Sequence, residues 1–109
     1  MELLELNKEN FEKAISENAN IIVDVYTEGC GPCKHLEKEL KILMETQNPN
    51  FLICKLDVNE YMEKAIEYDI MAVPVLLFFE KGKFIHRERG FKSAFEIKKI
   101  IDLKFQKLQ

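Results

Sequence analysis

Hydrophobic and polar positions follow two different patterns along this chain of 109 residues. Short apolar runs rich in β-branched and aromatic residues are typical of buried strands, whereas apolar residues recurring every three or four positions are typical of amphipathic helices. The first pattern predicts strands over residues 3–6, 21–26, 51–58, 75–79 and 84–89. Lys81-Gly82-Lys83 separates the last two, which predicts a hairpin of antiparallel strands joined by a tight turn.

The second pattern predicts helices, several of which follow a residue that can act as an N-cap. Asn7 precedes apolar positions at helical spacing, and Asn59 precedes a helix expected over residues 60–68. Ser93 and Glu96 form a capping-box pattern, which opens the helix near the end of the chain.

One further helix is expected between the first and second halves of the chain. It begins near Cys33 and ends before Asn48, and Leu36, Leu40 and Leu43 fall on one of its faces. Charged residues occupy its other faces, so this helix should pack one apolar side against a sheet.

In chain order these elements read βαβαβαββα. Helices between successive strands require parallel pairing, and the closing hairpin adds antiparallel strands. We therefore expect an α/β fold with a central mixed sheet flanked by helices. The sequence has no internal repeat or linker-like segment, and its length with 47% hydrophobic residues suits one core. Residues 1–109 are expected to form a single domain.

Charge and hydropathy argue against two classes of partner. The chain has 16 Lys and Arg residues against 19 Asp and Glu residues, a net charge of −3, with no basic cluster. Nucleic acid and anionic lipid are therefore not expected partners. The longest apolar run, residues 70–79, is too short to span a bilayer, so no membrane association is expected. The first residues lack the pattern of a secretion signal, which predicts a cytoplasmic location.

Cys30-Gly31-Pro32-Cys33 carries the clearest chemistry, because it joins a predicted strand to a predicted helix. Two thiols at this spacing can close a small disulfide, and a helix N-terminus stabilises a thiolate. So short a loop gains little stability from a cross-link, which makes a purely structural role a poor explanation. We expect Cys30, at the exposed end of the strand, to be the nucleophile and Cys33 to resolve its mixed disulfide.

Zinc binding is the alternative use of a Cys-x-x-Cys pair. It needs two further ligands, and the sequence offers only Cys54, His35 and His86, with no second close pair. We therefore expect no metal site. Cys54 lies in a predicted strand and is expected to act as a small hydrophobic core residue rather than a regulatory thiol. The two histidines are expected to be exposed to solvent.

Five segments in order resemble the thioredoxin family over essentially the whole chain. They are Ile22-Val23-Asp24-Val25 before the Cys30–Cys33 motif, Lys55-Leu56-Asp57-Val58, Val73-Pro74-Val75-Leu76-Leu77-Phe78-Phe79, Lys81-Gly82-Lys83 and Gly90. The resemblance implies a thioredoxin-like fold and a dithiol–disulfide oxidoreductase that reduces protein disulfides. It implies no bound cofactor, and electrons delivered by a separate thioredoxin reductase.

Asp24 interrupts an otherwise apolar strand, where burying a carboxyl group is costly. The resemblance implies that Asp24 lies beneath Cys33 and handles its proton, with Lys55 nearby. Burial would raise the pKa of Asp24 and the Lys55 charge would lower it, and a raised pKa suits proton exchange near neutral pH. The alternative is that Asp24 and Lys55 only satisfy a polar site in the core.

Pro74 precedes a predicted buried strand, where its missing N–H is tolerated only at the strand start. The resemblance implies a cis peptide bond before Pro74, packed against the dithiol. It also implies that the Val73 backbone pairs with an extended substrate segment. Gly90 reads as a turn residue on its own, and the resemblance places it at the border of the substrate groove. With Gly29, Gly31 and Pro32, these residues form the expected substrate-binding surface.

The sequence departs from the family beside the first cysteine. Thioredoxins typically have tryptophan there and three residues earlier, whereas this chain has Gly29 and Tyr26 and contains no tryptophan. We expect a monomeric general reductase that acts on disulfide-containing proteins. One alternative is an electron carrier dedicated to one client, which Gly29 favours. Another is a redox-inactive binding module, which should have lost a cysteine or Pro74.

Overall fold

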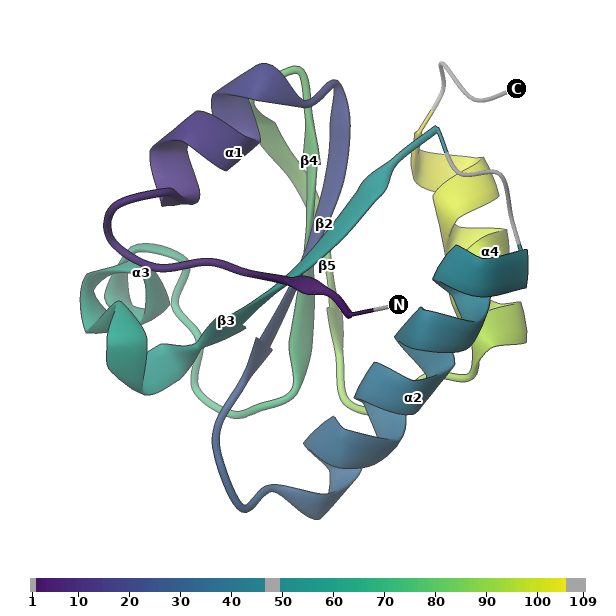
Figure 1. Cartoon of the computed structure of the whole chain (residues 1–109), viewed down its shortest axis with the longest axis horizontal. Coiled ribbons are helices and arrows are strands. Elements are labelled where there is room, and N and C mark those ends of the chain that lie inside the picture. Colours follow the sequence, from purple (N-terminus) through teal and green to yellow (C-terminus); the bar gives the residue numbers. More distant parts are fainter. Residues whose placement is uncertain (1, 47–49, 106–109) are drawn as a thin grey trace.

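Five strands form a mixed sheet in the order β1-β3-β2-β4-β5 in the computed structural model, which describes residues 2–46 and 50–105 (Figure 1). Both β1 and β2 pair in parallel with β3, whereas β4 pairs antiparallel with β2 and β5. The strands are β1 (Leu4–Glu5), β2 (Asn20–Tyr26), β3 (Leu52–Asp57), β4 (Val75–Glu80) and β5 (Lys83–Arg89). The expected α/β class with a central mixed sheet is confirmed.

Helices cover both faces of this sheet. Figure 1 shows α1 and α3 on one side and α2 and α4 on the other. They are α1 (Phe11–Glu17), α2 (Gly31–Thr46), α3 (Met62–Glu67) and α4 (Ala94–Lys104), with a 3₁₀ turn η1 (Val58–Glu60) before α3. Within the described ranges, no helix is long and apolar enough to cross a membrane.

Side chains of the central strand β2 alternate between two hydrophobic cores. Ile21 and Val23 belong to the core beneath α1, and Ile22 belongs to the core beneath α2 and α4. Because strand side chains alternate with a period of two, Asp24 faces the same side as Ile22. The only carboxylate of β2 is thereby directed toward the helix that begins at the dithiol.

The predicted caps Asn7 and Asn59 are wrong, each by a few residues. Helix α1 begins at Phe11. The Asn7 side chain instead accepts hydrogen bonds from the N–H groups of Glu9, at 2.9 Å, and Asn10, at 3.0 Å, in the turn that precedes the helix. The Asp57 carboxylate, at the end of β3, accepts the N–H of Asn59 over 2.9 Å and starts η1. Helix α3 therefore begins later than predicted, at Met62.

The predicted hairpin turn and the predicted capping box are both confirmed. Lys81 and Gly82 both have positive φ, 51° and 82°, and make the two-residue turn between β4 and β5. Ser93 and Glu96 form the complete capping box at the start of α4. Helix α2 ends at Thr46, in agreement with the predicted end before Asn48, and Asn48 itself lies outside the described residues. His86 is not fully exposed as expected, because it packs on the Phe78 ring and pairs with a glutamate two residues on.

Candidate active site

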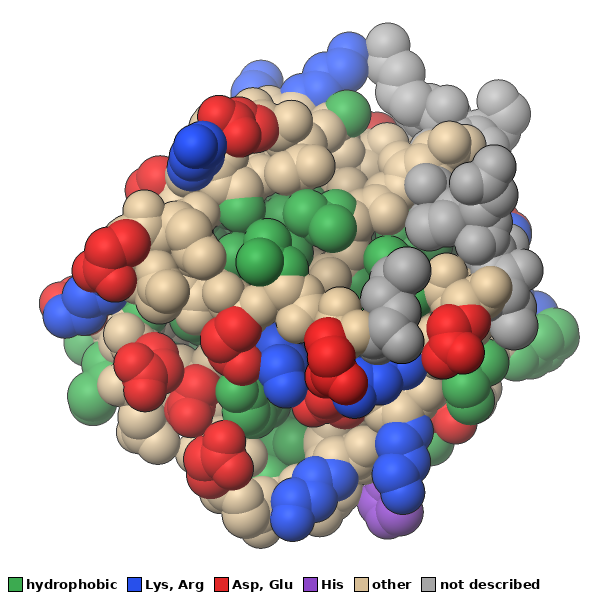
Figure 2. Space-filling view, in the orientation of Figure 1, with side chains coloured by type: hydrophobic (Ala, Val, Ile, Leu, Met, Phe, Trp, Pro, Cys, Tyr) green, Lys and Arg blue, Asp and Glu red, His purple; other side chains and the backbone are tan. Residues whose placement is uncertain are grey.

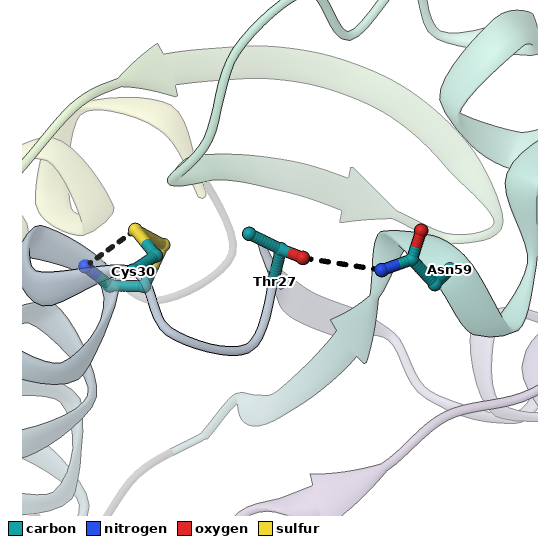
Figure 3. The surroundings of a disulfide bond; sticks show 4 residues. Thr27, Cys30 and Asn59 are labelled. Carbon is teal, nitrogen blue, oxygen red and sulfur yellow. Dashed lines mark hydrogen bonds between the residues drawn. A yellow bond between two sulfur atoms is a disulfide. The ribbon is translucent and has the colours of Figure 1, made fainter.

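The two cysteines of the Cys30-Gly31-Pro32-Cys33 motif lie at the start of α2 and form a disulfide, with their Cα atoms 5.2 Å apart (Figure 3). The backbone N–H of Cys33 donates to Cys30 Sγ over 3.2 Å. The N–H groups of a first helical turn have no intrahelical acceptor, so this sulfur occupies a position where negative charge is stabilised. No acidic side chain lies in that turn to oppose the effect.

The two sulfur-bearing residues differ in exposure. Cys30 is partly exposed, whereas Cys33 is only 3% exposed. A disulfide of another protein can therefore approach Cys30 but not Cys33. This asymmetry follows from position, because Cys30 precedes the helix and Cys33 lies buried in its first turn.

The loop that carries Cys30 is tied to the 3₁₀ turn that follows β3. Asn59 Nδ2 donates to Thr27 Oγ1 over 3.3 Å, joining the end of β2 to η1 (Figure 3). Gly29 has a φ of +77°, a left-handed conformation that turns the chain into α2. No sequence pattern points to Thr27 or Asn59 at the site, because their contact joins residues 32 positions apart.

Asp24 is 1% exposed, and neither of its carboxyl oxygens has a hydrogen-bond partner in the described part of the chain. Burial and, to a smaller extent, the Glu37 charge raise the pKa of this carboxyl group while the Lys55 charge lowers it, and the net value is about 7. The pKa thus lies where the group can both hold and release a proton at neutral pH. The two expected effects on the pKa, a rise from burial and a fall from the Lys55 charge, are both present, and the rise is the larger.

Lys55 is the register partner of Asp24 on the neighbouring parallel strand. Its ammonium group, however, contacts two other carboxylates, Glu37 Oε2 at 3.3 Å and Glu5 Oε1 at 3.8 Å. Tyr26 joins the same group by donating its hydroxyl to Glu5 over 2.9 Å. Figure 2 shows acidic and basic side chains interleaved where α2 lies beside the sheet edge.

Glu37 and Glu5 were not among the predicted site residues. A usable signal existed for Glu37, because it follows Cys33 by four residues and so shares its face of the helix. Glu5 offered no such signal, since its approach depends on β1 pairing with β3.

The Val73–Pro74 peptide bond is cis, as expected from the resemblance. Pro74 is buried and Val73 is partly exposed. The Pro74 carbonyl accepts the N–H of Gly90 over 2.9 Å, and Gly90 has a φ of +83°. The structure therefore brings Val73, Pro74 and Gly90 together, while Gly31 and Pro32 are exposed at the start of α2.

Two hollows adjoin the dithiol. One, of about 170 Å³, has Cys33, Glu37 and Lys55 in its walls, with Gly29 at its rim. The other, of about 360 Å³, is lined by Pro32, His35 and Phe91. The first hollow connects solvent with the buried cysteine and the charged group around Lys55.

Comparison with known proteins assigns this arrangement. The sequence model named Thioredoxin matches residues 2–103. The chain belongs to the thioredoxin family. It is 30% identical to thioredoxin of Mycoplasmoides gallisepticum over 87% of this chain and 94% of that protein. It is 28% identical to thioredoxin of Bacillus subtilis over 94% and 97% of the two chains.

Solved thioredoxins share the fold as well. A single-site mutant of thioredoxin from Halobacterium salinarum superposes with a TM-score of 0.85 at 27% identity, covering 94% of this chain and 90% of that one. With the dithiol geometry, these similarities define the protein as a dithiol–disulfide oxidoreductase with protein-disulfide reductase activity through Cys30 and Cys33. Like other thioredoxins, it acts on disulfide substrates with a reductase as electron donor.

Cys54 takes no part in this site. It is fully buried in the core beneath α1, and burial raises the pKa of its thiol to about 12. Its predicted core position is confirmed, as is the exposure of His35. Among the residues that the structure describes, no three His, Cys, Asp or Glu side chains gather in an arrangement that could hold a metal ion.

Proposed function

We propose that Cys30 is the attacking thiolate and Cys33 the resolving thiol of this reductase. The observation that carries the assignment is the unequal exposure of the two residues, together with the Cys33 N–H that points at Cys30 Sγ. A thiolate at Cys30 gains the stabilisation of the helix start and meets the substrate first.

The reaction then proceeds in two exchanges. Cys30 Sγ attacks one sulfur of the substrate disulfide, a mixed disulfide forms, and the other substrate sulfur leaves as a thiolate that takes up a proton. Cys33 loses its proton and attacks Cys30 Sγ, which releases the second substrate thiol. The substrate gains two electrons and two protons, the dithiol loses them, and the reductase donor restores the dithiol.

Asp24 is proposed to exchange the proton of Cys33, with Lys55 as a supporting residue. Support comes from its position on the α2 side of β2, its burial and its pKa of about 7. Water in the small hollow that Cys33 lines can carry the proton to and from solvent. The alternative is that Asp24 and Lys55 only satisfy a polar site in the core. In that case the pH dependence of resolution by Cys33 would be the same in Asp24→Asn as in the native chain.

The substrate segment is proposed to bind across the exposed surface around the dithiol. The partly exposed Val73 backbone would pair with an extended chain, which accounts for acceptance of many sequences, since main-chain groups are universal. Gly29, Gly31, Pro32, Pro74 and Gly90 would border that segment. The glycines there leave the backbone accessible.

The setting of the reaction is part of the proposal. A dithiol that reduces disulfides has to be kept reduced, which is the condition of the cytoplasm. We propose a monomer consisting of one domain over residues 1–109, because one sheet organises both cores. The net charge of −3 supports protein clients over nucleic acid.

Single-cysteine variants test the assignment of roles. Cys33→Ser should form a stable mixed disulfide with insulin, and mass spectrometry should locate it on Cys30, because no second thiol remains to resolve it. Cys30→Ser should neither reduce insulin nor accumulate that adduct. Cys54→Ala serves as the control with both active-site thiols intact. An adduct found on Cys33 in a variant that retains both thiols would reverse the two roles.

The Cys33→Ser variant also separates a general reductase from a dedicated carrier. Immobilised in its reduced form and exposed to cell extract, it should retain many different proteins, each released by dithiothreitol. Retention of a single protein, together with slow reduction of insulin by the native chain, would favour the dedicated carrier.

A further inference from the structure

The pairing of β2 with β3 sets Asp24 beside Lys55, yet no hydrogen bond or ion pair joins the two side chains within the described ranges. Lys55 Nζ donates instead to both carboxylate oxygens of Glu37, at 3.4 and 3.3 Å. The lysine paired with Asp24 in the sheet register is therefore held by a carboxylate from helix α2.

The position of Glu37 on α2 allows its carboxylate to reach Lys55. It lies one helical turn after Cys33, and both residues line the hollow of about 170 Å³ beside the dithiol. Lys41, one turn further along, contacts Glu37 at 3.1 Å. Burial alone would raise the pKa of Glu37, but hydrogen bonds from Lys41 and Lys55 hold that pKa below its usual range. Glu37 is thus a fixed negative charge at neutral pH.

We propose that Glu37 is a positioning residue of the reductase: it draws the Lys55 ammonium away from Asp24 and thereby tunes proton exchange between Asp24 and Cys33. The inference rests on the proposed role of Asp24. It adds a carboxylate on the active-site helix that acts on the reaction through the sheet lysine, without contact with the sulfur atoms.

The charges facing Asp24 support this assignment. Helix α2 contributes Glu37 and strand β1 contributes Glu5, which both raise the pKa of Asp24, while β3 contributes Lys55, which lowers it. On the other side, β4 contributes the apolar Leu76. Of the charged neighbours, Glu37 has the largest effect and outweighs Lys55. Removing it leaves Lys55 with only its longer contact to Glu5, and leaves the effect of the lysine charge on Asp24 less opposed.

Glu37→Gln tests the proposal, because it removes the charge and keeps the shape. Reduced protein is mixed with the chromogenic disulfide dithiobis-nitrobenzoate in a stopped-flow instrument, and the second release of thionitrobenzoate reports resolution by Cys33. In the native chain this rate should rise with pH as Asp24 ionises, with a midpoint near 7. In Glu37→Gln the midpoint should fall by about one pH unit. Titration of the Asp24 carboxyl carbon by NMR should show the same change.

The matched control is Glu45→Gln, which removes an exposed negative charge two turns further along the same helix. Its profile should coincide with that of the native chain. An equal displacement in both variants would indicate a general effect of net charge and would overturn the proposal, as would an unchanged Asp24 titration in Glu37→Gln.

Two further variants distinguish failure of the Glu37 inference from failure of the proposed role of Asp24. In Asp24→Asn the midpoint near 7 should disappear, and if it persists the role of Asp24 itself is wrong. In Lys55→Met the Glu37→Gln substitution should displace the midpoint by less than in the native chain, because only the direct effect of the Glu37 charge remains and the lysine it holds is gone. A full displacement there would show that Glu37 does not act by holding Lys55.

Discussion

The backbone N–H of Cys33 donates to Cys30 Sγ over 3.2 Å. This contact joins the two ends of the Cys-Gly-Pro-Cys segment. It forms because α2 begins at Gly31, one residue after Cys30, so that the Cys33 N–H in its first turn points toward Cys30 Sγ. The same donor would stabilise a Cys30 thiolate once the disulfide is reduced, because it has no carbonyl acceptor within the helix.

We therefore expect Cys30 to be ionised below the pKa of an ordinary thiol, about 8.5. The rate of alkylation of Cys33→Ser by iodoacetamide, measured from pH 5 to 10, should show a midpoint below that value. Adding Lys34→Glu to Cys33→Ser places an acidic side chain in the first turn of α2, so the midpoint of Cys30 alkylation should be higher than in Cys33→Ser alone. A midpoint at the ordinary value in Cys33→Ser would mean that the helix start does not activate Cys30.

Asp24 should make the stability of the protein depend on pH. Its pKa is about 7 in the folded chain against a reference value of 3.8, so the folded state binds more protons between these pH values. The stability associated with protonated Asp24 is full below pH 4 and is lost as pH rises to about 7. At pH 8 the loss is about 4 kcal/mol, at roughly 1.4 kcal/mol per pKa unit.

Asp24→Asn cannot ionise, so its free energy of unfolding should exceed that of the native chain at pH 8 and the difference should shrink toward pH 5. Urea denaturation of both proteins at the two pH values measures it. Because all other titrating groups are shared, the change in the difference belongs to position 24. A difference that does not vary with pH would mean that Asp24 titrates normally.

Residues adjacent in sequence to the dithiol were predictable, and those brought to it by packing were not. Cys30 and Cys33 form one continuous motif, and a carboxylate at position 24 stands out in an apolar strand. Glu37 and Glu5 look like ordinary surface charges until α2 is laid over β3 and β1 is paired beside it. Their function depends on distances across elements, which no local pattern encodes.

The errors in helix starts have a similar cause. Asn59 is a good N-cap in isolation, but Asp57 precedes it with a carboxylate and captures the N–H of Asn59. The chain therefore makes a 3₁₀ turn first, and α3 begins three residues later than Asn59. Competition between neighbouring acceptors, rather than propensity, decided this boundary.

Gly29 should resist replacement because of its backbone rather than its surroundings. Its φ is +77°, and a Cβ built on it would meet no atom within 4 Å. Gly29→Ala should therefore destabilise the protein by about 1 kcal/mol through left-handed strain alone. Gly29→Asn should cost less, since asparagine tolerates this conformation. Urea denaturation of the three proteins checks the order, and equal stability of the native and Gly29→Ala chains would contradict it.

The same strain bears on the tryptophan that many thioredoxins have at this position. Gly29→Trp would have to adopt left-handed backbone or shift the loop that Asn59 holds through Thr27. We expect slower reduction of insulin by Gly29→Trp than by Gly29→Asn, because displacement of the loop moves Cys30. Faster reduction would show that the aromatic contact outweighs the strain.

Cys54 should behave as a core residue with no part in the redox cycle. It is 0% exposed, it packs with the side chains beneath α1, and burial raises the pKa of its thiol to about 12. The reduced native chain treated with iodoacetamide at pH 8 should therefore be modified at Cys30 and not at Cys54, whereas unfolding in urea should expose all three thiols.

Substitution separates the packing role of Cys54 from a redox role. Cys54→Ser places a hydroxyl group among apolar neighbours without a partner and should lower the free energy of unfolding by about 1–3 kcal/mol. Cys54→Ala removes the sulfur without adding a polar group, and its insulin reduction rate per folded molecule should equal that of the native chain. A loss of rate in Cys54→Ala at unchanged stability would assign this thiol to the redox cycle, since packing alone cannot produce that combination.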